Sequence, residues 1–232
     1  MHLKTYLLLA LLFTFLGITA QTKADSLVVQ VQLKFNQEDL RLNATYISAQ
    51  KDTIAFDKIK FYLSDLVFIY KDNSQKKQLP TYHLIDSDAI ESQNFSICYS
   101  KEKEIIGLKF NIGVDSLASV SGAMAGDLDA TKGMYWAWQS GYINFKIEGK
   151  STSCLTRKNK FHFHIGGYLK SYEALRTVTL KCSIKEQNKV NLILDLGKLF
   201  SEISLKETNT IMIPGKEAVK MADLLPNLFS IR

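Results

Sequence analysis

Apolar and polar residues alternate along most of this chain. Between residues 27 and 35, Val29, Val31, Leu33 and Phe35 are apolar, whereas the residues between them are glutamine or lysine. A period of two places one set on each face of an extended chain, so this segment predicts a half-buried β-strand. Similar runs rich in β-branched and aromatic residues predict strands over 59–70, 82–85, 95–99, 105–112, 141–147, 161–165, 177–184 and 190–196.

Helical periodicity is scarce by comparison. One helix is expected over 216–225, where Pro226 ends it, and short helical turns are expected over 116–120 and 197–203. Eight or more strands without long helices between them favour two packed antiparallel sheets over a parallel α/β sheet. We therefore predict an all-β fold, a single antiparallel β-sandwich with Greek-key-like connections and short helices near the C-terminus.

The first twenty residues have the pattern of a secretion signal. His2 and Lys4 precede an almost wholly apolar run from Tyr6 to Leu16, and a small residue, Ala20, precedes polar Gln21. We expect a signal peptide over 1–20, cleavage after Ala20, and an exported protein in the periplasm or outside the cell. No cysteine at the end of the signal offers a lipid attachment point, and no later run is long enough to cross a bilayer, so we do not expect a membrane-embedded protein.

The composition changes this picture little. Hydrophobic residues make up 46% of the chain and there are only three prolines, which favours one sizeable core, so we expect a single domain over 21–232. The net charge of +6 comes from lysines and arginines spread along the chain. Because nucleic-acid binding needs a concentrated basic face, we expect no nucleic-acid partner.

Three cysteines, Cys98, Cys154 and Cys182, follow the predicted signal peptide. Disulfides persist in exported proteins, and a Cys154–Cys182 bridge would hold together the strands around residues 161–167. Cys98 would then be a buried free thiol. The alternative is that all three are small buried side chains without a bridge.

Beyond the signal peptide the histidines are His83, His162 and His164. Residues two apart on a strand project to the same face about 6.5 to 7 Å apart, so His162 and His164 are close enough for two imidazoles to bind one metal ion. Alternating polar residues also mark any half-exposed strand, so the pattern alone is only moderately specific. His83 is isolated, and a lone histidine in an apolar strand is usually a hydrogen-bonded core or edge residue.

Both tryptophans, Trp136 and Trp138, follow the longest segment without a periodic pattern, 122–133. Long loops of this kind are often functional. On a strand both indoles would leave on one face, as part of a core or of a platform that stacks on sugars. Indole has no lone pair suited to a metal. Oxidative opening to kynurenine would add an aniline nitrogen and a ketone oxygen, but it needs an external oxidant because the chain has no haem-attachment motif.

Asp115, Asp127 and Asp129 lie beside glycine-rich turns, which makes calcium binding conceivable. The spacing lacks the glycine and the distal glutamate of an EF-hand loop, so capping of turns is the favoured interpretation.

Six blocks, taken in order, resemble the MbnP-like family of exported copper-binding proteins. They are Phe61-Tyr-Leu-Ser64, Tyr82-His-Leu-Ile-Asp86, Ile112-Gly-Val-Asp-Ser116, Gly126-Asp-Leu-Asp129, Gly133-Met-Tyr-Trp-Ala-Trp-Gln-Ser-Gly-Tyr142 and Phe163-His-Ile-Gly-Gly-Tyr168. The resemblance implies a β-sandwich that is exported and holds copper through histidine and a tryptophan-derived kynurenine. It also implies a partner, a dihaem peroxidase-like enzyme that oxidises the tryptophan.

Carried over by position, the resemblance implies His164 as the first copper ligand, His83 as the second, and Trp136 or Trp138 as the modified residue. His162 lies beside this pattern and is kept as a further candidate metal ligand. We predict a non-enzymatic copper-binding protein for storage, scavenging or delivery, with Cu(I) favoured by a nitrogen-rich site. This prediction requires His83, His164 and one tryptophan to converge in space.

Two alternatives remain open from the sequence. A carbohydrate- or protein-binding sandwich would use Trp136, Trp138, Tyr135 and Tyr142 as an aromatic platform. A zinc-dependent hydrolase would use His162, His164 and a carboxylate such as Asp86.

Overall fold

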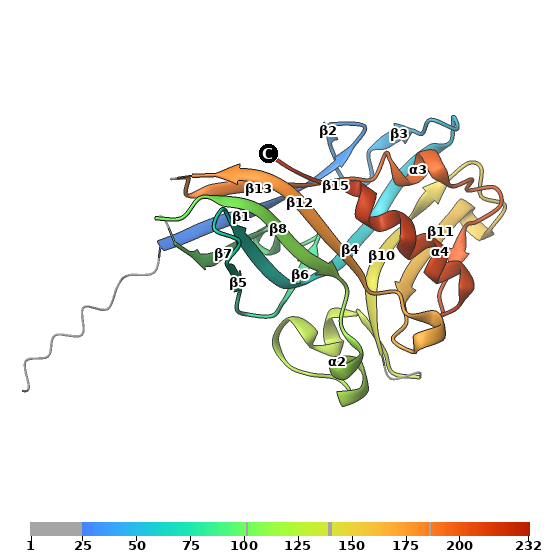
Figure 1. Ribbon diagram of the computed structural model, residues 1–232. Helices are drawn as coiled ribbons and strands as arrows, with labels where there is room; N and C mark the ends of the chain where they lie inside the picture. Colours follow the sequence, from blue (N-terminus) through green and yellow to red (C-terminus); the bar gives the residue numbers. More distant parts are fainter. Residues whose placement is uncertain (1–24, 101, 139–140, 186) are drawn as a thin grey trace, which may run out of the picture.

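The computed structural model describes residues 25–100, 102–138, 141–185 and 187–232, arranged as two β-sheets with short helices (Figure 1). The predicted signal peptide over 1–20 lies outside the described residues. Within them, no helix is both long and apolar enough to span a bilayer.

The smaller sheet has five strands in which β1 is central. β1 (Asp25–Phe35) pairs in parallel with β13 (Lys189–Asp195) and antiparallel with β7 (Asn94–Tyr99) and β2 (Glu38–Asp39). β15 (Phe229–Ile231) pairs antiparallel with the outer side of β13.

The larger sheet is built around β4, an 18-residue strand. The pairing order is β12-β8-β4-β10-β11-β14, and β3, β5 and β6 pair with β4 while β9 pairs with β10. The bounds are β3 (Thr45–Ile47), β4 (Thr53–Tyr70), β5 (Gln75–Lys77), β6 (Tyr82–Asp86), β8 (Ile105–Ile112), β9 (Tyr135–Trp136), β10 (Gly141–Ser151), β11 (Lys160–Gly166), β12 (Arg176–Ile184) and β14 (Thr210–Ile211).

The helices are short. They are α2 (Ser116–Ser121), α3 (Leu199–Glu202) and α4 (Lys216–Leu224), with 3-10 turns η1 (Ile90–Gln93), η2 (Gly126–Leu128), η3 (Ala130–Lys132), η4 (Arg157–Asn159), η5 (Lys170–Tyr172) and η6 (Leu225–Leu228). Figure 1 shows α4 running beside β11, with which it is in contact. The helix α2 precedes the long loop that leads to β9.

Two apolar clusters cover the two faces of the larger sheet. On the inner face, Phe61 of β4, Phe145 of β10 and Phe163 of β11 belong to the main core, which also contains Val29 and Leu194 of the smaller sheet. The outer face carries a second cluster around β4, β6 and β10, closed by the segment that leads to β9. This outer cluster contains Tyr62, Leu84, Val114, Ala118, Leu128, Met134, Trp136, Tyr142 and Ile143.

The structure confirms the all-β fold and the predicted strands, with two differences. The pairs β1–β13 and β11–β14 are parallel, whereas antiparallel pairing throughout was expected. Parallel neighbours need long connections, and their pairing depends on contacts distant in the sequence, which periodicity does not report. The segment 122–133, expected to lack regular structure, contains η2 and η3.

The predicted Cys154–Cys182 bridge is wrong, since all three cysteines are free. Cys154 lies in the turn after β10, where its thiol donates a hydrogen bond to the Leu205 carbonyl, while Cys182 lies on β12. β8 and β4 separate β12 from β10 in the pairing order. Cys98 is exposed on β7, not buried as expected.

Candidate metal centre

The hairpin of β10 and β11 positions a cluster of three polar side chains on the outer face of the larger sheet. Glu148 of β10 lies opposite His162 of β11, and Lys146 lies opposite His164. Because side chains alternate along each strand, these residues share one face, while Phe163 and Ile165 point into the main core. The strand pattern therefore directs both imidazoles and one carboxylate to the same place.

The ligand atoms of Glu148, His162 and His164 all lie within 4.8 Å of one another. His164 Nε2 is 2.7 Å from Glu148 Oε1, and the two imidazole rings are nearly perpendicular, with centroids 6.3 Å apart. His164 is only 7% exposed, whereas His162 and Glu148 are half-buried. Two imidazole nitrogens and a carboxylate oxygen in this arrangement suit a borderline divalent transition metal.

Electrostatics keep the carboxylate available as an anion. The hydrogen bond from His164 is the main cause that lowers the pKa of Glu148 to about 2; burial acts in the opposite direction, and the nearby charges of His164, Lys146 and His162 lower it further. Lys146 is buried beside this pair, and burial lowers the pKa of its ammonium group. Its Nζ donates a hydrogen bond to the Gly133 carbonyl and does not occupy the cluster.

Trp136 covers Gly166 on the face of β11 that also carries His164. It lies on β9, opposite Gly141 of β10, and is 6% exposed. Its ring crosses Gly166, where an added Cβ would come within 2.8 Å of ring atom Cζ3. Gly166 follows His164 by two residues on β11. The indole therefore lies on the face of β11 that carries His164, displaced from His164 by two residues along the strand.

Trp138 lies in the turn after β9 and is 64% exposed, with its ring centroid 6.0 Å from that of Trp136. The expectation that both indoles leave one strand on the same face is therefore wrong, because β9 ends at Trp136. One indole is part of the outer cluster and the other is on the surface.

His83 lies on the opposite face of the sheet. It pairs with Leu63 of β4, and both Leu63 and the next inward residue of β6, Ile85, belong to the main core. Its ring stacks on Phe95 of β7, with centroids 4.0 Å apart and planes 17° apart. The structure thus brings His162 and His164 together and keeps His83 away from them, because β6 directs Leu84 and Asp86, not His83, to the outer face.

Glu148 is the one residue of this cluster that the sequence analysis missed. Glu148 lies one residue beyond the strand end expected at residue 147, whereas β10 continues to Ser151. The available signal was the hairpin itself. Antiparallel strands that follow one another in sequence usually pair. A polar residue of the preceding strand could therefore have been expected to lie beside the two histidines of β11.

The three aspartates considered for calcium have structural partners. Asp127 forms an ion pair with Lys132 at 2.7 Å and accepts a hydrogen bond from the Leu84 N–H. Asp129 caps η3 and Asp115 caps α2. In the part of the chain that the structure describes, only Glu148, His162 and His164 form a group of three possible ligands.

The residues of the other two alternatives are also separated. Trp136 and Tyr142 are buried, so they do not form an exposed platform with Trp138. Asp86 forms a largely buried ion pair with Lys60 at 2.7 Å, and it is Glu148 that contacts the imidazoles.

Comparison with known proteins gave one family and one fold. A family model described as MbnP matches residues 24–213. Among solved structures, MbnP from Methylosinus trichosporium superposes with a TM-score of 0.62 and 13% sequence identity, over 90% of this chain and 98% of that one. At that identity the superposition shows a shared fold. No curated protein sequence matches.

Proposed function

From the premise that this chain belongs to the MbnP family, whose model spans most of it, we propose that it binds copper through Glu148, His162 and His164. The observation that carries the proposal is the meeting of two imidazoles and one carboxylate within 4.8 Å on the outer face of the larger sheet. The family is associated with copper, and this cluster supplies ligand types that copper accepts.

The donor set favours Cu(II) over the Cu(I) expected from the sequence. Cu(I) prefers soft sulfur ligands, whereas imidazole nitrogen with carboxylate oxygen suits Cu(II), which is also the strongest binder in the divalent first-row series. The cluster contains no thiol or thioether, so its chemistry supports capture of the oxidised ion.

Trp136 is the tryptophan that we propose for oxidation to kynurenine. Its ring lies on the face of β11 that carries His164, so an aniline nitrogen or ketone oxygen formed there would lie beside the cluster. The oxidant in this proposal is a separate dihaem peroxidase-like enzyme. Export through the segment 1–20 and a non-enzymatic role in copper storage, scavenging or delivery complete the proposal, as the family resemblance implies.

Copper titration of the purified full chain tests the site. One Cu(II) should bind per chain, and the electron paramagnetic resonance spectrum should show coupling to two imidazoles. His162→Gln, His164→Gln and Glu148→Gln should each weaken binding by about tenfold or more, and either histidine change should leave coupling to one imidazole. Trp136→Phe should affect the oxidised protein only, and peptide mass should locate any added oxygen at Trp136.

His83→Gln is the matched control, because it removes an imidazole from the opposite face of the same sheet. It should leave copper affinity and the resonance spectrum unchanged. If His83→Gln abolishes binding while His162→Gln and Glu148→Gln do not, the cluster on β10 and β11 is not the copper site.

A further inference from the structure

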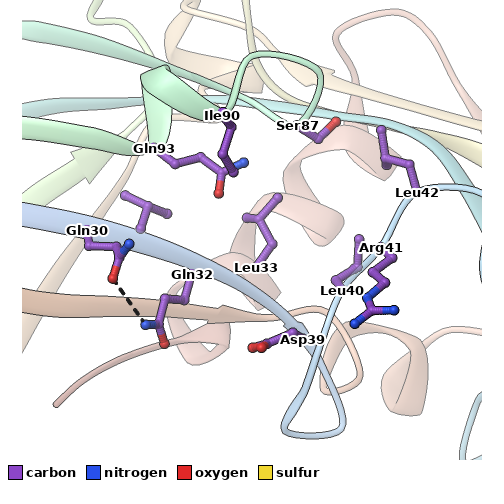
Figure 2. Close-up of a pocket in the computed structure, with 11 residues that line it drawn as sticks. Gln30, Gln32, Leu33, Asp39, Leu40, Arg41, Leu42, Ser87, Ile90 and Gln93 are labelled. Carbon is purple, nitrogen blue, oxygen red and sulfur yellow. Dashed lines mark hydrogen bonds between the residues drawn. The ribbon is translucent and has the colours of Figure 1, made fainter.

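A cavity of about 500 Å³ opens beside β1, away from the proposed copper site (Figure 2). Its walls are residues 30–33 of β1, residues 39–42 at and after the end of β2, and Ser87, Ile90 and Gln93 at η1. The volume lies within the range of sites that hold small organic ligands.

Main chain occupies the edge of β1 at both ends of this cavity. β7 pairs with β1 as far as Gln30, and farther along the Leu33 carbonyl accepts a hydrogen bond from the Leu40 N–H. An added strand therefore finds no free length of edge to pair with. An occupant of this cavity must instead be recognised by the side chains that line it.

Gln93 supplies a largely buried polar group. It is only 9% exposed, and no hydrogen bond joins its side-chain amide to another described residue. Figure 2 shows this amide directed from η1 into the opening. The other two amides of the cavity satisfy each other in part, since Gln32 Nε2 donates to Gln30 Oε1 at 3.4 Å. Because a buried amide without a partner is costly, Gln93 favours a ligand that offers it a hydrogen bond.

Arg41 supplies a positive charge on another side of the opening (Figure 2). Its backbone bonds to the Tyr46 hydroxyl, but its guanidinium has neither an ion pair nor a hydrogen bond within the described ranges. The other charged residue of the wall, Asp39, is already paired with Lys34 at 2.9 Å. A guanidinium presents a planar fork of N–H donors that fits a carboxylate, so Arg41 favours an anionic group in the ligand.

The wall between these two polar groups is apolar. Leu33 and Leu40 lie between Gln93 and Arg41 in Figure 2, and Leu42 and Ile90 complete this wall. Ile90 is 69% exposed at the rim, so a ligand seated there would remove apolar surface from water. The cavity therefore selects for an aliphatic group placed between an anion and a hydrogen-bonding group.

We propose that this cavity binds a small organic carboxylate that carries one amide and a branched aliphatic group. The carboxylate pairs with Arg41, the amide exchanges hydrogen bonds with Gln93, and the aliphatic group packs on the leucines of the wall. N-acyl derivatives of apolar amino acids combine these three groups. The site shares no residue with the proposed copper site and does not depend on it.

Calorimetric titration of the full chain with N-acetyl-leucine tests the proposal. We expect saturable binding of one molecule per chain, with shifts of the backbone amide resonances of Arg41 and Gln93. Arg41→Gln should weaken binding by about three- to tenfold, the effect of one partly exposed charge-assisted pair. Gln93→Leu should weaken it by about two- to tenfold, the effect of one or two neutral hydrogen bonds.

Arg157→Gln is the matched control for the charge. Arg157 lies in the turn η4, outside the cavity, so this variant loses the same charge without losing a wall of the site. It should bind N-acetyl-leucine like the unaltered chain. If Arg157→Gln weakens binding as much as Arg41→Gln does, the ligand responds to net charge alone and the proposal is overturned.

Changes in the ligand keep the test independent of protein folding. N-acetyl-leucine amide lacks the anion, so the unaltered chain should bind it more weakly, and Arg41→Gln should bind it and N-acetyl-leucine equally. Isocaproate lacks the amide, so its weaker binding should be insensitive to Gln93→Leu. Equal binding of N-acetyl-leucine and its amide by the unaltered chain would overturn the proposal. So would the absence of saturable binding, or saturation without shifts at Arg41 and Gln93.

Discussion

At the scale of single residues, identical side chains have opposite environments in this protein. His164 lies beside an anionic carboxylate on the outer face, whereas His83 is stacked on Phe95 in the core with its Nε2 buried and without a hydrogen-bond partner. The difference comes from which face of its strand each histidine occupies.

His83 should make the folded state sensitive to acid. Burial is the main cause that lowers its pKa below the ordinary value of 6.5, and the nearby charge of Asp127 opposes this only in part. Below about pH 6.5 the unfolded chain takes up a proton that the folded chain does not. The free energy of unfolding therefore decreases as the pH is lowered, until the pH passes the pKa of His83 in the folded state. Each unit of difference between the two pKa values corresponds to about 1.4 kcal/mol.

His83→Phe removes the titrating group and keeps an aromatic ring against Phe95. Urea unfolding on both sides of pH 6.5 should show a smaller loss of stability on acidification in this variant than in the unaltered chain. An identical dependence on pH in the two proteins would show that His83 does not titrate in this way.

At the scale of elements, one carboxylate joins the end of a strand to a turn far away in sequence. Asp195, the last residue of β13, accepts hydrogen bonds from the backbone N–H groups of Asn36, Gln37 and Gly197. Asn36 and Gln37 have φ values of 50° and 73° in the turn between β1 and β2. Asp195 therefore holds the left-handed turn that connects β1 to β2.

Asp195→Ala should destabilise the protein by about 2 kcal/mol or more, because it leaves backbone donors without their charged acceptor. Chemical denaturation followed by fluorescence measures the change. Asp223→Ala is the control, since Asp223 is exposed and pairs with Arg176 at the surface, where such pairs contribute less than about 1 kcal/mol. Equal effects of the two substitutions would contradict the role given to Asp195.

At the scale of the whole molecule, packing between the two sheets holds the fold together without disulfide bonds. The main core draws apolar residues from both sheets, and the three cysteines remain thiols. Burial raises the pKa of the Cys182 thiol to about 11 and also raises that of Cys154. Exposure therefore favours Cys98 as the reactive thiol, while burial makes the thiols of Cys154 and Cys182 less reactive.

Thiol titration of the native protein should modify Cys98 first and Cys182 slowly, while Cys154, at 1% exposure, should react only after unfolding. The melting temperature should be the same with and without a reducing agent, because no bridge is available to break. A lower melting temperature under reducing conditions, or fewer than three thiols in the unfolded chain, would indicate a disulfide.

The sequence alone determined the strands and much of the candidate site. Alternation is a local property of the chain, so it predicted most of β4 and the segments that became β1, β6, β7, β8, β10, β11, β12 and β13. It also predicted the common face of His162 and His164. Specific blocks such as Phe163-His-Ile-Gly-Gly-Tyr168 identified the family.

Only the tertiary structure decided which strands meet and which face of each is turned inward. The register of β10 against β11 adds Glu148 to the two histidines, while the pairing of His83 with Leu63 turns His83 into the core. Parallel pairing of β1 with β13 and antiparallel pairing of β1 with β7 join residues more than fifty positions apart. A period of two divides a strand into two faces, but contacts between distant segments select the buried face and the neighbours of each side chain.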